Sequence, residues 1–86
     1  MAIELPKVGQ VYRASQDVRL HGNSNITVLS AAAPQTLRKG SQAEITAVGG
    51  DYFDLNCNDG SVQGVHSWGL LLRVKKAVFG LNFEKV

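Results

Sequence analysis

Glycine and proline interrupt this chain so often that no long helix fits between them. The 86 residues include nine glycines and two prolines. No segment between them carries apolar residues at i, i+3, i+4 and i+7 over the roughly 11 residues that an amphipathic helix needs. The segments that remain are short, rich in β-branched and aromatic residues, and bounded by turn-forming residues. The sequence therefore predicts an all-β protein.

Two neighbouring segments show the alternation of half-buried strands. Residues 43–48 place an apolar side chain at every second position, and residues 52–56 place Phe53 and Leu55 on one face. Between these segments, Gly49 and Gly50 are expected to supply the positive φ angles of a tight hairpin. Further strands are expected at residues 10–14, 18–20, 26–29, 61–65 and 70–75, with turns at 21–25 and 58–60 and a bend at 67–69. Short strands separated by turns at this spacing predict a small barrel, which has no long edges to protect.

The length of the chain allows one domain. At 86 residues and 9.3 kDa a single small core is expected, which we place at about residues 10–75, with an N-terminal arm at 1–9 and a C-terminal extension at 76–86. The one cysteine, Cys57, excludes an internal disulfide framework. The first residues lack the basic and apolar regions of a secretory signal, and no apolar run is long enough to span a membrane. A cytoplasmic protein without a membrane partner is expected.

Residues 37–74 resemble the SH3-like barrels, and among these the bacterial SH3 domains. Leu37-Arg-Lys-Gly40 is similar to the turn before the first long hairpin strand, and Gly50-Asp-Tyr-Phe-Asp-Leu55 to the next strand, with Tyr52 in the place of its leading aromatic residue. Asp59-Gly60 and Gly64-Val-His-Ser-Trp-Gly-Leu-Leu71 are similar to the following turn, a short 3₁₀ turn and the closing strand. The resemblance implies a small SH3-like barrel of five to six short antiparallel strands, to which this chain adds a C-terminal strand.

A second resemblance covers a shorter part of the chain. Gly60-Ser-Val-Gln63, followed by Leu70-Leu-Leu-Arg73, resembles the end of the type II dihydrofolate reductases. In these SH3-like barrels a Val-Gln-Ile-Tyr segment binds folate and nicotinamide in the pore of a tetramer. Val62 and Gln63 match that segment, whereas Gly64 and Val65 replace its isoleucine and tyrosine. An oligomeric, reductase-like enzyme is therefore one alternative.

The chain offers few residues for catalysis. Cys57 and His66 could approach each other across a hairpin, but nucleophilic catalysis also needs a group that orients the base, and a lone cysteine at a strand end is more often a small buried hydrophobe. His21, Cys57 and His66 do not have the spacing of metal ligands. We therefore expect a protein that is not an enzyme and that needs no cofactor and no metal.

Aromatic and acidic side chains favour a binding surface. The alternation in residues 52–56 places Tyr52 on the side opposite the core, and three aromatic residues resemble the positions that line the ligand groove of SH3-like barrels. Two aspartates flank Tyr52 and would set a charge preference. We expect a protein-binding module, an adaptor or an inhibitor of a larger cytoplasmic complex. Its expected site consists of Tyr12, Asp51, Tyr52, Asp54 and Trp68.

Basic residues favour a second alternative. The net charge is only +2, but lysines and arginines gather near the end of the last predicted core strand and in one earlier turn. A basic face interleaved with aromatic residues is typical of nucleic-acid-binding barrels. The residues that would form this face are Arg38, Lys39, Arg73, Lys75 and Lys76.

The C-terminal extension places Phe79, Leu81 and Phe83 on one face at a period of two. We expect an additional strand, which either folds back on the barrel beside Ile3, Leu5 and Val8 or pairs with a second copy of the chain. Folding back is favoured, because an exposed apolar stripe on a monomer promotes aggregation. Pairing with a second copy would make a homodimer through these residues.

Overall fold

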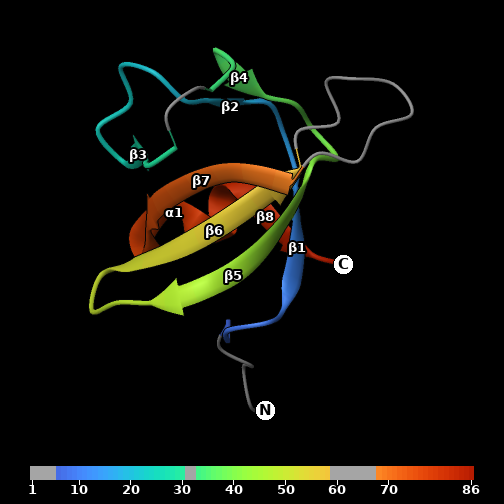
Figure 1. Cartoon of the computed structure of the whole chain (residues 1–86), viewed down its shortest axis with the longest axis vertical. Coiled ribbons are helices and arrows are strands. Elements are labelled where there is room, and N and C mark those ends of the chain that lie inside the picture. The colour runs from blue at the N-terminus through green and yellow to red at the C-terminus, as the bar shows by residue number, and fades with distance from the viewer. Residues whose placement is uncertain (1–5, 31–32, 59–67) are drawn as a thin grey trace.

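The computed structural model describes residues 6–30, 33–58 and 68–86 (Figure 1). Its elements are β1 (Val11–Ala14), β2 (Val18–Arg19), β3 (Ile26–Val28), β4 (Thr36–Leu37), β5 (Gln42–Val48), β6 (Tyr52–Asn58), β7 (Trp68–Lys75), α1 (Lys76–Asn82) and β8 (Phe83–Lys85). Several predictions fall on residues outside the described ranges. These residues are 59 and 60 of the expected turn at 58–60, the expected strand at 61–65 with the reductase-like residues Val62, Gln63, Gly64 and Val65, His66 and Ser67, and Ile3 and Leu5 of the arm.

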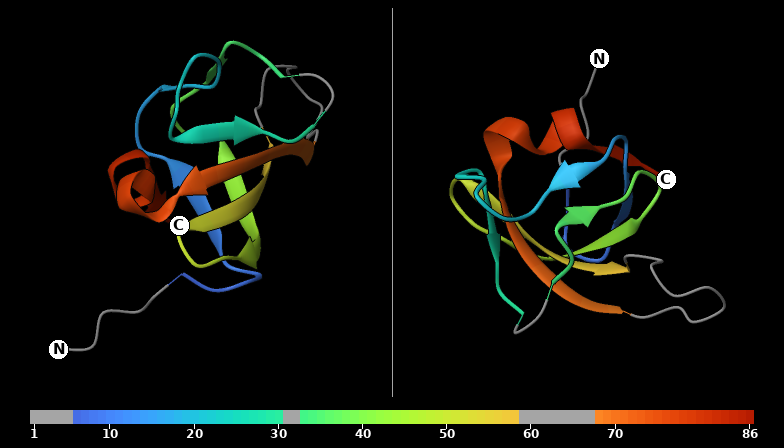
Figure 2. Two further views of the ribbon diagram at one scale, coloured as in Figure 1. Left: turned by 90° about the vertical axis from the view of Figure 1, so that its left-hand side faces the viewer. Right: turned by 90° about the horizontal axis from the view of Figure 1, so that it is seen from above.

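Six strands form one antiparallel sheet in the order β3-β7-β6-β5-β1-β8, and β2 pairs with β4 separately. Figures 1 and 2 show β5, β6 and β7 as one curved layer, with α1 and β8 behind it. Strands from the two ends of the chain, β1 and β8, lie side by side because residues 12–14 pair with residues 83–85. The expected all-β, small barrel fold is confirmed, with one short helix added.

The core lies between the curved layer and α1. Every second residue of the long strands points into it, so β6 contributes Phe53, Leu55 and Cys57. Two bulges interrupt this alternation, and the first lies between Ile45 and Ala47 of β5. The bulge turns Ala47 away from the core, whereas the period of two in the sequence predicts that its side chain points into the core. The buried hydrophobic residues are Tyr12, Ala14, Val18, Leu20, Ile26, Leu37, Ala43, Ile45, Phe53, Leu55, Cys57, Leu70, Leu72, Val74, Phe79 and Phe83.

Phe79 of α1 joins three parts of the barrel. Its ring centroid lies 5.0 Å from that of Tyr12 on β1, 4.8 Å from that of Phe53 on β6 and 5.1 Å from that of Phe83 at the start of β8. Aromatic pairs at these separations attract one another beyond the effect of buried area alone. Phe79 therefore ties the two ends of the chain to the middle of the sheet.

The C-terminal extension folds back on its own barrel, but mostly as a helix. Residues 76–82 form α1, and only Phe83–Lys85 forms the additional strand. A strand would have placed Phe79, Leu81 and Phe83 on one face. Because the chain is helical up to Asn82, Phe79 of α1 and Phe83 directly after it, four residues apart, meet on one side, where both are buried, whereas Leu81 is 71% exposed. The period of two was therefore misleading here, because two of its three members also fit a helical spacing.

We expect Phe79→Ala to destabilise the protein by about 3–5 kcal/mol, because it removes a buried aromatic ring and leaves a cavity. A domain of this size has a total stability of roughly 4–13 kcal/mol, so the variant is expected to be partly unfolded at modest urea concentrations. Urea unfolding followed by circular dichroism measures the change. Leu81→Ala is the matched control, and its stability is expected to change by less than about 0.5 kcal/mol. Equal effects of the two substitutions would contradict the position of α1.

Candidate functional site

Most of the expected binding residues lie on the side of β6 and β7 that faces away from the core. Antiparallel strands place directly opposed residues on the same face, and the register opposes Tyr52 to Lys75 and Asp54 to Arg73. Figure 1 shows this layer from the front. We call this surface the outer face, and it consists of Tyr52, Asp54 and Asn56 of β6 with Trp68, Leu71, Arg73 and Lys75 of β7.

A β-bulge brings Trp68 to the outer face. Leu70 and every second residue after it on β7 are buried, so unbroken alternation would bury Trp68 as well. The register shifts between Cys57 and Asn58, and Gly69 has a φ of 131°. The N–H of Gly69 donates a hydrogen bond of 2.8 Å to Oδ1 of Asn56. The extra residue reverses the alternation, and Trp68 is 41% exposed in β7 rather than part of the expected bend.

Tyr52 is positioned by the absence of a side chain at Gly49. The β5–β6 hairpin forms where it was expected, and the N–H of Gly49 donates a hydrogen bond of 2.8 Å to the carbonyl oxygen of Tyr52. Neither Gly49 nor Gly50 has a positive φ, so the expected reason for the two glycines was wrong. A Cβ on Gly49 would instead lie 2.0 Å from Cε2 of the Tyr52 ring. The first glycine is required by this close approach of the ring to the backbone.

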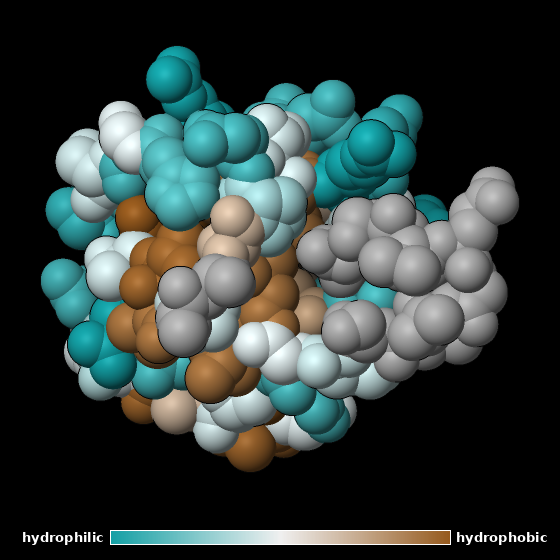
Figure 3. Space-filling view, turned by 45° about the horizontal axis from the view of Figure 1, so that its top comes forward, coloured by the Kyte–Doolittle hydropathy of each residue, from teal (hydrophilic) through white to brown (hydrophobic). Residues whose placement is uncertain are grey.

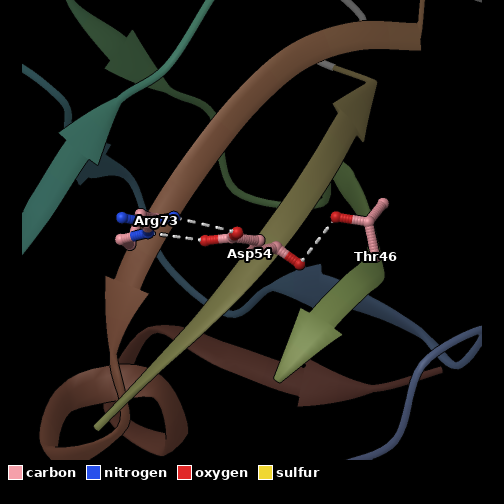
Figure 4. A network of polar contacts seen from close by, with 3 residues as sticks. All are labelled: Thr46, Asp54 and Arg73. Carbon is pink, nitrogen blue, oxygen red and sulfur yellow. Dashed lines mark hydrogen bonds and ion pairs between the residues drawn. The ribbon is translucent and has the colours of Figure 1, made fainter. Parts of the chain in front are cut away.

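The two charged groups that the sequence separates are neighbours in the sheet. Arg73 donates hydrogen bonds from Nε and Nη2 to the two carboxylate oxygens of Asp54, at 2.9 and 3.2 Å (Figure 4). The guanidinium carbon of Arg73 lies 4.1 Å from the centroid of the Tyr52 ring, a cation–π distance. The hydroxyl of Thr46 donates to the carbonyl oxygen of Asp54 at 3.2 Å. These contacts hold Tyr52, Asp54 and Arg73 in one arrangement.

The chemistry of this arrangement is that of a binding surface. The hydrogen bonds from Arg73 to Asp54 raise the pKa of Arg73 further above its usual value. Arg73 therefore stays protonated at every physiological pH and cannot transfer a proton. It can hold Asp54 and cover the ring of Tyr52, which gives the surface a fixed shape and charge pattern.

An apolar patch occupies the other end of the outer face. We define it as Leu29, Trp68 and Leu71, which are 44%, 41% and 38% exposed. Leu29 follows β3 and lies beside Leu71, to whose carbonyl oxygen its N–H donates at 2.8 Å. Figure 3 shows hydrophobic side chains gathered in the middle of one face of the molecule, with hydrophilic side chains above them. Exposed apolar residues that gather in this way often mark an interaction site.

Leu29, Leu71 and Arg73 were not expected in the protein-binding site. A signal for Leu71 was present, because in a half-buried strand the middle residue of Leu70-Leu71-Leu72 must point away from its two neighbours. Leu29 gave no comparable signal, because its position depends on the pairing of β3 with β7, which joins residues more than 40 positions apart. From the sequence, Arg73 was expected in the nucleic-acid-binding site. Its pairing with Asp54 becomes evident only once the register between β6 and β7 is known.

Tyr12 lies apart from the outer face, and Asp51 lies at its edge. Tyr12 is 7% exposed, and its ring packs edge-on against Phe79. Its hydroxyl lies 3.4 Å from Oε1 of Gln10. Alternation along β1 turns Tyr12 inward together with Ala14, so its side chain does not reach the outer face. Asp51 is exposed at the tip of the β5–β6 hairpin, beside Tyr52.

The basic residues of the alternative nucleic-acid site are not brought together. Arg38 and Lys39 lie in the turn before β5. The first residues of β5 pair with the end of β6, and the end of β6 pairs with the start of β7, so this turn lies near the start of β7. Lys75 and Lys76 lie where β7 ends and α1 begins. At about 3.3 Å per residue, the eight residues of β7 separate its two ends by roughly 23 Å. Arg73, the remaining member, is bound to a carboxylate.

The described residues that were weighed for catalysis and metal binding are Cys57 and His21. Cys57 points into the core, where it is fully buried. His66, its hypothetical partner, lies outside the described residues. In the part of the chain that the structure describes, no group of three histidine, cysteine or acidic side chains is placed to hold a metal ion.

No protein-family model, curated protein or solved structure matches this chain at a significant level. Among the described residues, no helix has the length and apolar character required to cross a membrane.

We expect Gly49→Ala to destabilise the protein by about 1–3 kcal/mol, because its Cβ forces the Tyr52 ring away from the hairpin. Gly50→Ala is the matched control, since a Cβ there meets nothing within 4 Å, and its stability is expected to change by less than about 1 kcal/mol. Urea unfolding measures both variants. The chemical shift of the Arg73 Nε–H, which the Tyr52 ring influences, is expected to change in Gly49→Ala alone. An unchanged shift there would contradict the packing described for Tyr52.

We expect Gly69→Ala to destabilise the protein by about 1–3 kcal/mol, because a residue with a Cβ is strained at this φ. Gly80→Ala in α1 is the control, and it is expected to stabilise by about 0.5–1 kcal/mol. A Cβ would meet nothing within 4 Å at either position, so only the backbone conformation distinguishes them. Urea unfolding followed by the fluorescence of Trp68, the single tryptophan, measures both. Stabilisation of Gly69→Ala would contradict the bulge.

Proposed function

We propose that this chain is a non-catalytic protein-binding module, and that it binds its partner through the outer face. One observation carries the proposal: Tyr52, Trp68 and Arg73 lie on the same face of two paired strands. These three residue types are the ones most enriched among the residues that dominate binding energy at protein interfaces.

The rigidity of the outer face supports this function. A side chain that is already fixed in its binding conformation loses little entropy when a partner binds. Tyr52 is held by the missing side chain of Gly49 and by the guanidinium of Arg73, and the bulge at Gly69 holds Trp68 outward. The strongest anchors of the proposed surface are therefore ordered before the partner arrives.

The order of the elements supports assignment to the SH3-like barrels. In the SH3-like barrels, as the resemblance implies, a short helical turn precedes the closing strand. From the sequence, both were expected around Trp68. In this chain the same order occurs later, at α1 and β8, where β8 returns to pair with β1. We infer an SH3-like barrel whose closing segment is the C-terminal extension, and which acts as an adaptor or as an inhibitor of a larger complex.

A pull-down from the native cell tests the proposed function. Wild type and Leu81→Ala are expected to recover the same partner protein, because Leu81 lies on α1, away from the outer face. Tyr52→Ala and Trp68→Ala are each expected to reduce recovery at least tenfold, the effect of about 1.4 kcal/mol in binding free energy. Circular dichroism confirms that the variants are folded. A partner that both variants retain would show that binding uses another surface.

A further inference from the structure

Glu44 lies at the border of the apolar patch, and no described residue forms an ion pair with it. It lies on β5, directly opposite Asn56 of β6, so it points to the same side as the outer face. Within the described part of the chain the ion pairs are Arg13–Glu84 and Arg73–Asp54, and neither includes Glu44. Arg13 is the nearest cation by register, but its Nε lies 2.9 Å from Oε1 of Glu84.

The register places Glu44 in one row with the apolar patch. Across the sheet the order is Glu44 on β5, Asn56 on β6, Leu71 on β7 and then Leu29. Neighbouring strands are about 4.8 Å apart, so the Cα atoms of Glu44 and Leu71 are separated by roughly 10 Å. Asn56 lies between them, and its side chain is engaged with the bulge at Gly69.

The other charges of the outer face are either paired or farther from the apolar patch than Glu44. The carboxylate of Asp54 accepts both hydrogen bonds from Arg73. Lys75 lies at the far end of β7, opposite Tyr52, seven residues from Trp68 and four from Leu71, which at about 3.3 Å per residue is roughly 13 Å from Leu71. Among the described residues of this side of the sheet, Glu44 is therefore the charge without an ion pair that lies closest to the apolar patch by register, and it is negative.

We propose that the apolar patch and Glu44 together recognise a basic segment of the partner protein. The segment inserts a large apolar side chain between Leu29, Trp68 and Leu71, and it places a lysine or arginine on Glu44 about 10 Å away. A cation at this position neutralises Glu44 while the interface excludes water, whereas an acidic segment or a nucleic acid would bring a second negative charge to it. This inference rests on the proposed protein-binding function and names the chemistry of its partner.

A phage-displayed random 12-residue peptide library, selected against the full chain at low salt, tests this inference. Enriched peptides are expected to combine a large apolar residue with at least one lysine or arginine. Synthetic copies of an enriched peptide are then titrated into wild type, Glu44→Gln, Leu71→Ala and Glu84→Gln. We expect Glu44→Gln and Leu71→Ala to weaken binding at least fivefold and Glu84→Gln, the control acid on β8, to change it less than twofold.

A double-mutant cycle separates the Glu44 contact from a general effect of charge. Replacing the basic residue of the peptide by glutamine is expected to weaken binding to wild type at least fivefold and to leave binding to Glu44→Gln nearly unchanged. Equal losses against both proteins, enrichment of acidic peptides, or no enrichment at all would overturn the inference. If the basic preference is absent but Trp68→Ala still loses the native partner, the proposed function stands and only the basic segment is rejected.

Discussion

The barrel depends on the burial of one aromatic ring, that of Phe79. This ring contacts side chains of β1, β6 and β8, which are far apart in the sequence. The pairing between β1 and β8 covers only three residues on each strand. Its backbone hydrogen bonds are therefore few for joining the two ends of the chain. Packing against Phe79 adds the apolar contact that makes this closure stable. Because closure decides which side of each strand is inside, it also decides which side is left for binding.

Two bulges then determine which residues the outer face presents. The bulge at Gly69 turns Trp68 outward, and the bulge between Ile45 and Ala47 turns Ala47 away from the core. Each is supported by a side-chain hydrogen bond to the backbone: Asn56 accepts from the N–H of Gly69, and Thr46 donates to the carbonyl oxygen of Asp54. A change of one residue in register thus converts a core position into a surface position.

The local features of the fold could be predicted from the sequence, and the features that depend on pairing could not. Alternation identified the strands around Ile45 and Phe53 and the side on which Tyr52 lies. It failed at Phe79, where a period of two and a helical spacing share residues, and at the bulge beside Trp68, where no local pattern reveals an extra residue. Tyr12 is buried because Phe79 packs on it, a contact between residues 67 positions apart. The ion pair between Asp54 and Arg73 could not be predicted either, because it depends on the register between β6 and β7.

The close approach of Tyr52 to Gly49 has a consequence for how this surface can change in evolution. Any side chain at position 49 conflicts with the ring at position 52, so the residue tolerated at one position depends on the residue at the other. A lineage that first replaced Tyr52 by a smaller residue would free position 49 to accept alanine or serine. Once that second substitution was made, the return of an aromatic residue at position 52 would be blocked. The order of the two substitutions therefore decides whether the loss of the aromatic anchor is reversible.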